Sequence, residues 1–485
     1  MTAFLEERLT QFAEWLAAED THAKHHLRLL EEADAALLGL RSFSPEERME
    51  LAARLERWRY QHLKERGESV RNIDWRLADA LDLAANELAG RPTRAPRQTN
   101  RYIQRHGTTE PVGEPWWEAL NRDVPLESVC EQAAHVTAEN FSPGRNAVCA
   151  SGASPGLAPG KGENASAQAP KNDRPEFTHP DQGVVRRWRI FMYTPLYLSS
   201  YCVNYCTYCG FRYNEPIERK HLTVAEAVRE AEVLLSRGFR HILLVAGDFP
   251  QLTSPQYFLE VVEALVKLGV DPGIEIAPQP TEVYEELARA GVRSITLYQE
   301  TYIPEVYRQY HPRGPKAAYH WRLEGLDRAG EAGIGRLGLG LLLGLGDPRT
   351  EFPRLVRHGQ YLKERFPKKR LAFSLPRIHE APADFKIPYP VDDETFIRLY
   401  CGLRLAFPDA ELVLSTRESP ELRNRLAKIC ITQMSAGSST VPGGYADLTV
   451  LGQLGKQFPV HDDRSPAEVC RWLEENGFEL VWRID

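Results

Sequence analysis

Residues 190–211 read IFMYTPLYLSSYCVNYCTYCGF. The first nine form an apolar run rich in aromatic and β-branched side chains, which is typical of a buried β-strand. Cys202, Cys206 and Cys209 follow on the next loop with the spacing C-x3-C-x2-C. Three thiolates on so short a loop can surround a [4Fe–4S] cubane and leave one iron without a protein ligand. The motif therefore predicts a cluster whose open iron chelates the amine and carboxylate of a small molecule.

A zinc site is the structural alternative for these three cysteines. Zinc sites usually complete four ligands with a second cysteine pair or with histidines, and no second pair occurs nearby in the sequence. The chain has eight cysteines, and those outside the motif stand far apart, which argues against a disulfide framework. An isolated cysteine is usually a small buried apolar residue. We therefore assign no role to Cys130, Cys149, Cys401, Cys430 and Cys470.

Eight β-rich runs, with helix-like stretches between them, occupy the chain after residue 184. They are residues 190–198, 241–247, 273–279, 294–301, 336–345, 371–378, 411–418 and 431–437. Eight such units in roughly 255 residues match a closed (β/α)8 barrel of the TIM type. A doubly wound open sheet is the alternative α/β fold. In a barrel the chemistry lies at the carboxyl ends of the strands, so the residues after each run are the candidates for function.

The composition is that of a globular protein, with 42% hydrophobic and 26% charged residues in 485. The formal net charge of -7 gives no basic footprint for nucleic acid. The sequence has no run of about 18 apolar residues, and its start, MTAFLEERLTQFAEW, lacks an apolar signal segment. We therefore expect a cytoplasmic protein that binds neither nucleic acid nor a membrane.

The sequence before the barrel divides into two parts. Residues 1–90 carry apolar side chains at helical spacing, which predicts a small all-helical domain of unknown role. Residues 91–183 are interpreted as a linker or docking strap, basic and proline-rich at first, with a short helix near 126–140. The rest of this part is rich in Gly, Pro, Ala and Ser and is predicted to be a disordered insertion. Residues 184–485 then form the barrel and its tail.

Further segments carry a family resemblance: LYQETY, HPRGPKAAYHWRLEGLDRAGEAGI, FSLPRI, LSTRESPELRNR, MSAGSSTVPGGYADL and HDDRSP. With TPLYLSSYCVNYCTYCGF they resemble the aromatic-amino-acid lyase branch of the radical S-adenosylmethionine (SAM) superfamily. That branch contains the tyrosine lyases that make 2-iminoacetate for thiamine synthesis, a hydrogenase maturase and tryptophan lyases. The resemblance runs from about residue 184 to the end, and nothing before about residue 125 shares it.

The resemblance implies SAM as a second cofactor beside the [4Fe–4S] cluster. It places Tyr208 and Phe211 against the adenine of SAM, and Gly247 and Asp248 at its amine. The chain departs from the family pattern here, because the family usually has Gly-Glu followed by His. In this sequence the acid is the shorter aspartate and the next residue is Phe249.

Four more residues are implied to contact SAM or substrate. Glu300 and Arg322 match positions that orient the methionyl group of SAM, and an acid with an arginine suits a zwitterionic amino-acid group. Arg417 and Ser435 lie near the ends of the seventh and eighth runs. The resemblance implies that they hold the carboxylate of the substrate and its neighbouring groups in the catalytic site.

Two segments could be mistaken for other sites. Residues 461–464, HDDR, resemble a metal site but match the tail of the family, so we expect them to close the barrel end. Residues 338–344, GLGLLLG, lie inside the fifth run and do not open a helix, which argues against nicotinamide binding. Glycines there would instead let the backbone and a cofactor approach closely.

The implied reaction starts when the reduced cluster splits SAM into methionine and a 5′-deoxyadenosyl radical. The radical takes hydrogen from the amine of tyrosine, and the Cα–Cβ bond breaks to give 2-iminoacetate (dehydroglycine) and p-cresol for thiamine thiazole synthesis. An electron donor such as flavodoxin or ferredoxin is implied. We further hypothesise that the N-terminal helical domain docks a protein partner.

Three alternatives remain open. The first is a lyase for another amino acid such as tryptophan, motivated by Phe249 and by Leu375, where the family more often has Phe. The second is a hydrogenase-maturase-like enzyme without the second cluster, because Cys470 is the one cysteine of the tail. The third is a non-enzymatic iron–sulfur or zinc protein, in which the open coordination position would be filled.

Overall fold

The computed structural model describes residues 44, 97, 99–106, 111–143, 187–447 and 455–483. The helical domain expected over residues 1–90 lies outside the described residues, apart from Ser44. The insertion expected before residue 184, with Cys149, also lies outside them. Both expectations stay predictions.

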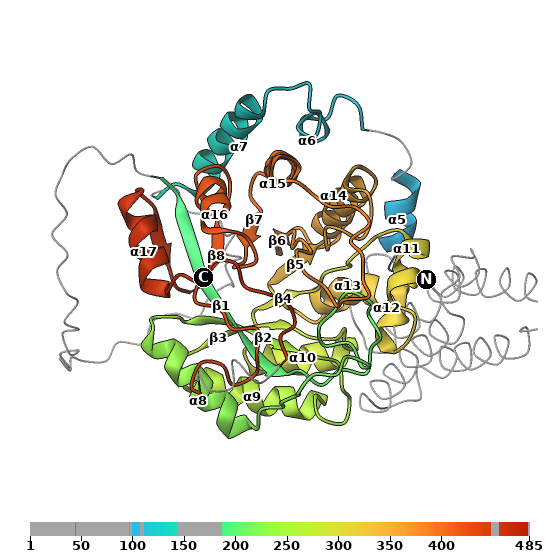
Figure 1. Ribbon diagram of the computed structural model, residues 1–485, viewed down its shortest axis with the longest axis vertical. Helices are drawn as coiled ribbons and strands as arrows, with labels where there is room; N and C mark the ends of the chain where they lie inside the picture. The colour runs from blue at the N-terminus through green and yellow to red at the C-terminus, as the bar shows by residue number, and fades with distance from the viewer. Residues whose placement is uncertain are drawn as a thin grey trace, which may run out of the picture.

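Nine parallel strands form one sheet in the described residues, and eight of them close into a barrel (Figure 1). The strands are β1 Arg189–Ser199, β2 His241–Ala246, β3 Asp271–Glu275, β4 Ser294–Thr296, β5 Arg336–Gly340, β6 Arg370–Ser374, β7 Glu411–Leu414, β8 Gln433–Ser435 and β9 Glu479–Val481. Neighbours follow in chain order from β2 to β8, and β1 pairs with both β8 and β2. The predicted (β/α)8 barrel is confirmed, and each of the eight runs overlaps one strand.

Helices follow the strands around the outside of the barrel (Figure 1). They are α8 Val224–Ser236, α9 Pro255–Lys267, α10 Thr281–Ala290, α11 Pro304–Tyr310, the 3-10 turn Pro315–Ala317, α12 Tyr319–Leu323, α13 Gly325–Glu331, α14 Pro348–Arg365, α15 Asp393–Ala406, α16 Pro420–Ala427 and α17 Pro466–Glu475. Several begin at a serine or threonine whose side chain accepts from the third backbone N–H, which satisfies a donor left free at a helix start. The residues are Thr223, Ser254, Ser419 and Ser465.

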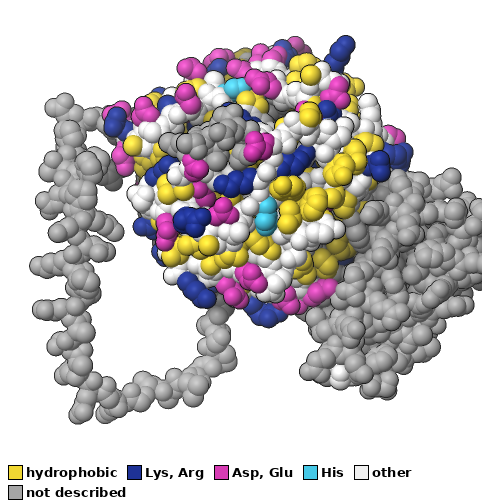
Figure 2. Space-filling view, turned by 60° about the horizontal axis from the view of Figure 1, so that its bottom comes forward, with side chains coloured by type: hydrophobic (Ala, Val, Ile, Leu, Met, Phe, Trp, Pro, Cys, Tyr) yellow, Lys and Arg dark blue, Asp and Glu magenta, His cyan; other side chains and the backbone are white. Residues whose placement is uncertain are grey.

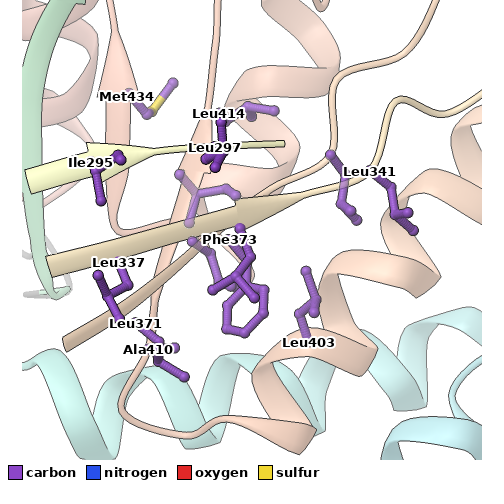
Figure 3. Close-up of a cluster of buried hydrophobic side chains, with 14 of the residues drawn as sticks. Ile295, Leu297, Leu337, Leu341, Leu371, Phe373, Leu403, Ala410, Leu414 and Met434 are labelled. Atoms are coloured by element: carbon purple, nitrogen blue, oxygen red, sulfur yellow. The ribbon is translucent and has the colours of Figure 1, made fainter. Parts of the chain in front are cut away.

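The core lies between the strands and the outer helices, and a polar group fills the amino end of the barrel. Figure 3 shows the apolar layer, in which Phe373 of β6 is fully buried; its ring stacks on Phe407 with centroids 4.6 Å apart. Inside the barrel, Arg336 Nε of β5 donates to Glu411 Oε2 of β7 at 2.6 Å. Arg336 also donates to Gln433 of β8. Each of these three residues is the first of its strand, and their side chains fill the amino end of the barrel. A small molecule would therefore enter from the carboxyl end.

Three helices that precede the barrel lie against its outer side (Figure 1): α5 Thr99–His106, α6 Pro115–Glu118 and α7 Leu126–Phe141. α7 is the helix predicted near 126–140, whereas α5 lies in a stretch expected to be a linker or strap. Arg97 pairs with Glu331 at 2.6 Å, and Thr99 Oγ1 donates to Asp327 at 2.7 Å. Because these contacts join residues far apart in the sequence, no local sequence pattern predicted α5. The division into domains stays a prediction.

Three cysteines that are isolated in the sequence meet where α7 packs on α15. Cys401 of α15 lies beside Cys130 of α7 and beside Cys430, which follows α16. Cys401 and Cys430 are fully buried in the apolar core and Cys130 packs against it, as expected of isolated cysteines. Cys470 is half-buried on α17.

The C-terminal tail pairs with β1, the strand that closes the barrel. β9 pairs with residues 189–191 at the start of β1. The buried carboxylate of Asp462 accepts from Arg423 of α16 and from Arg464. The structural role expected for residues 461–464 agrees with these contacts, since the segment ties the tail to α16.

The surface mixes charges of both signs. On the face shown in Figure 2, Lys and Arg side chains are interspersed with Asp and Glu and with apolar groups. Large apolar side chains with high exposure in the described residues are Val112, Tyr213, Val266, Leu268 and Tyr389. No described helix has both the length and the apolar character that crossing a bilayer requires.

Candidate active site

The loop after β1 carries the three cysteines of the C-x3-C-x2-C motif to the carboxyl end of the barrel. All three side chains line one cavity of about 550 Å³, which we call the cluster cavity. Small-molecule sites commonly have this size. The loop is fixed to the end of β2, because Val203 N donates to the backbone oxygen of Asp248 at 2.8 Å. The structure thus gathers the predicted cluster ligands where barrel enzymes carry their chemistry.

The surroundings of the thiols fit an iron–sulfur cluster. Burial raises the pKa of the Cys206 and Cys209 thiols, and nearby cysteines raise it further, so both thiols stay protonated until a metal displaces the proton. Phe211 N donates to Cys209 Sγ at 3.4 Å and Asn204 Nδ2 to Cys202 Sγ at 3.6 Å; such bonds tune cluster-bound thiolates. In the described part of the chain, no three His, Cys, Asp or Glu side chains are placed to hold one lone metal ion. A cubane is larger, and its cysteines bind different irons.

A charged group stands on the wall of the cluster cavity. Glu300 Oε1 accepts from Lys316 Nζ at 2.6 Å and from Arg322 Nη2 at 3.4 Å. Glu300 has a φ of 71°, the one positive φ of a non-glycine residue in the described ranges. Such strain costs about 1–3 kcal/mol and clusters at functional sites. The two residues predicted for the methionyl group are therefore together, and Lys316 is a third member that the sequence analysis missed.

The end of β2 meets the cluster loop closely. Gly247 and Asp248 both line the cluster cavity. A Cβ at Gly247 would lie 2.3 Å from the backbone oxygen of Tyr201, so the contact requires glycine. Asn204 Nδ2 donates to Asp248 Oδ2 at 3.1 Å. The aspartate is thus held toward the cavity by an asparagine of the cluster loop.

The two aromatic residues predicted to contact adenine differ in position. Phe211 is buried and lines the cluster cavity. The Tyr208 hydroxyl hydrogen-bonds with His311 Nε2 at 2.7 Å, and Tyr208 is not among the residues that line the cavity. Phe249, the departure from the family pattern, packs edge-on against Tyr201. The adenine contacts stay predictions.

Arg417 and Ser435 meet in a second, smaller space of about 50 Å³, the Arg417 hollow. The guanidinium of Arg417 lies 3.2 Å from the ring centroid of Phe458. Glu418, the next residue in the sequence, pairs instead with the buried Arg377. Arg417 has no carboxylate partner among the described residues. The structure therefore brings the two predicted substrate residues together, with an unpaired cation beside Ser435.

Glu275, the last residue of β3, was not a candidate from the sequence. It lines both the cluster cavity and the Arg417 hollow, as do Val245 and Tyr298, so the two spaces adjoin. Burial, followed by the negative charge of Glu300, raises the pKa of Glu275 to about 7. The sequence could have indicated Glu275, because it is the one acidic residue in the third run.

Two parts of the chain match known protein families. Residues 196–358 match the Radical SAM superfamily, and residues 370–479 match the Biotin and Thiamin Synthesis associated domain. The first match contains the cysteine loop, the end of β2 and the Glu300 group. The barrel and its site therefore define a radical SAM enzyme, a class that uses a [4Fe–4S] cluster and SAM.

Individual relatives narrow the class. The 2-iminoacetate synthase of Escherichia coli is 38% identical over 295 residues, which cover 61% of this chain and 78% of the relative. That of Salmonella typhimurium is 36% identical over the same shares. The crystal structure of the FeFe-hydrogenase maturase HydG from Carboxydothermus hydrogenoformans has a TM-score of 0.62 at 28% identity, covering 91% of this chain and 85% of HydG. The chain belongs to the 2-iminoacetate synthase family.

Proposed function

We propose that this protein cleaves the Cα–Cβ bond of tyrosine into 2-iminoacetate and p-cresol, for synthesis of the thiamine thiazole. One observation carries the proposal: the cavity that holds the three cysteines adjoins a hollow that presents Arg417 and Ser435. A cofactor site is thus continuous with a site whose cation suits an amino-acid carboxylate. The kinship with 2-iminoacetate synthases supports the product.

The residues divide the work between cofactor and substrate. The three cysteines would hold the cluster, and Asp248, Glu300 and Arg322 would hold the amino-acid part of SAM. When bound, the cluster and SAM supply the 5′-deoxyadenosyl radical that takes a hydrogen atom from the substrate. Arg417 binds the substrate carboxylate and Ser435 a neighbouring polar group. The filled amino end of the barrel limits solvent access, which protects a reactive intermediate from side reactions.

The remaining parts of the proposal concern partners and location. A flavodoxin or ferredoxin serves as the electron donor, the protein acts in the cytoplasm, and residues 1–90 dock a protein partner. A truncation that begins before Arg97 tests the last point, because it keeps the contacts of α5 with the barrel. Unchanged activity together with unchanged pull-down partners would contradict the docking role.

The experiment reconstitutes the protein anaerobically, reduces it with dithionite and supplies SAM with tyrosine. We expect 5′-deoxyadenosine, p-cresol and glyoxylate, the hydrolysis product of the imine, from the wild type and none from Cys206→Ala. Formation of 5′-deoxyadenosine without p-cresol would reject tyrosine and leave the radical SAM assignment intact. Tryptophan is then the first of the other amino acids to supply.

A further inference from the structure

Glu275 stands at the junction of the two spaces without a protein partner. It ends β3 and lines both the cluster cavity and the Arg417 hollow. Within the described residues, no hydrogen bond or ion pair involves its carboxylate. Of the nearby cations, Lys316 and Arg322 bind Glu300, and the guanidinium of Arg417 stacks on Phe458. Glu275 thus faces the ligand space.

An amino acid brings two charges to such a place. Its carboxylate requires a cation and its ammonium group an anion, and Arg417 and Glu275 line the same small hollow. We propose that Glu275 binds the α-ammonium group of the substrate and accepts a proton from it. This inference rests on the proposed function in one respect only, that the substrate is an α-amino acid.

The proton transfer has a simple balance. One N–H bond of the ammonium breaks, one O–H bond forms on Glu275, and the electron pair stays on nitrogen. The neutral amine is the form from which the proposed reaction removes a hydrogen atom. A carboxylate of ordinary pKa is a poor base for an ammonium group. Burial raises the pKa of Glu275 to about 7 and so reduces the difference between the pKa of the ammonium group and that of the carboxyl group.

Several ionisable groups face Glu275 and set its charge. They are Glu300, Lys316 and Arg322 toward the cluster cavity, Arg417 toward the hollow, and the hydroxyls of Tyr193, Tyr197 and Tyr298. Burial raises the pKa of all three tyrosines, and the charge of Glu275 raises it further. A phenol of the protein therefore does not compete with Glu275 as the base at neutral pH.

Ligand binding without turnover tests the proposal. Reconstituted, SAM-loaded protein is kept without reductant, and equilibrium dialysis measures tyrosine and its analogue without the amine, 3-(4-hydroxyphenyl)propionate. In Glu275→Gln we expect tyrosine affinity to fall about 10- to 100-fold, the usual range for a lost charged hydrogen bond. The analogue should bind both proteins within about twofold, because it has no ammonium group.

The pH profile is a second readout. Tyrosine affinity of the wild type should fall as pH drops below about 7, since the protonated carboxyl loses its charge. In Glu275→Gln this pH dependence should disappear, and Glu275→Asp should retain it. Glu286→Gln, an exposed acid of α10, serves as the matched control and should bind like the wild type. Equal iron content and SAM affinity in all variants show that the site is assembled.

Three outcomes would overturn the proposal. An equal loss for tyrosine and its analogue would place Glu275 against the phenol or the ring, and no loss for tyrosine would exclude contact. A wild type that binds no α-amino acid would reject this inference and the proposed function together. A wild type that binds and cleaves a different amino acid rejects tyrosine alone, and the same comparison with that amino acid and its deaminated analogue then decides the role of Glu275.

Discussion

Replacing Glu275 by glutamine should stabilise the cluster-free protein, and more so as pH rises. The carboxyl lies in the barrel without a protein donor, and burial raises its pKa from 4.5 to about 7. In the unfolded chain the group ionises near pH 4.5, whereas in the folded chain it resists ionisation until about pH 7. The ionisable carboxyl therefore lowers the free energy of unfolding progressively between pH 4.5 and about 7, and the full loss of stability persists above pH 7.

The magnitude follows from the shift. One pKa unit corresponds to about 1.36 kcal/mol, so the raised pKa corresponds to a penalty of about 3 kcal/mol at most. Water in the adjoining cavity screens the charge, and we therefore expect Glu275→Gln to gain about 1–3 kcal/mol at pH 8. Near pH 5 the pH exceeds the unfolded pKa of 4.5 by only about half a unit, while the folded carboxyl is still protonated, so the gain should shrink to about 1 kcal/mol or less.

Thermal unfolding followed by circular dichroism at pH 5, 6, 7 and 8 measures this difference. The control is Glu286→Gln, whose exposed side chain should change the stability by less than about 0.5 kcal/mol at every pH. A Glu275→Gln protein that is less stable than wild type at pH 8, or a gain in stability that does not depend on pH, would contradict this prediction. Stabilisation together with lost tyrosine affinity would show an acid kept for ligand binding at a cost in stability.

Three further predictions rest on other contacts. Asp462→Asn leaves Arg423 buried without a counter-charge, so urea unfolding should show a loss of about 3–5 kcal/mol; a loss below about 1 kcal/mol contradicts this. Gly247→Ala places a Cβ 2.3 Å from a backbone oxygen of the cluster loop, so iron retention should fall, unlike in Gly335→Ala, where the nearest atom is at 3.7 Å. Lys316→Met removes the 2.6 Å partner of the cavity carboxylate, so SAM affinity by dialysis should fall about tenfold; unchanged affinity would exclude a role in SAM binding.

Most of the fold could be predicted from the sequence, because the strands of a parallel barrel are continuous apolar runs between helices. Every one of the eight predicted runs overlaps a strand, although several runs extend past the strand into the loops at the barrel mouth, where Tyr298 and Glu300 line the cavity. The run 336–345 ends as a strand at Gly340. β9 was missed because it has three residues, none of them fully buried, and pairs only with the start of β1.

The sequence predicted the residues of the candidate site that belong to a motif. It did not predict the residues that only tertiary contacts bring to the site. The cysteine spacing and the family segments predicted the candidate metal ligands together with Glu300 and Arg322. Lys316 and Asn204 enter through contacts between loops far apart in the sequence. The glycines of residues 338–344 were expected to admit a cofactor. A Cβ at Gly340 would instead lie 2.3 Å from Ser374 O and from Tyr298 Cδ1, so protein atoms explain this glycine.

Two carboxylates on neighbouring strands have opposite surroundings, and this contrast explains why each suits a different task. Glu300, after β4, is held by Lys316 and Arg322 in a strained backbone conformation. A carboxylate fixed in this way presents a constant contact to a charged cofactor. Glu275, at the end of β3, has no such partner, and burial brings its pKa near neutrality. A pair of acids whose environments differ in this way commonly separates a fixed charge from a proton carrier. A cation placed next to Glu275 would lower its pKa and would therefore abolish the proposed proton transfer to it, even if the substrate still bound.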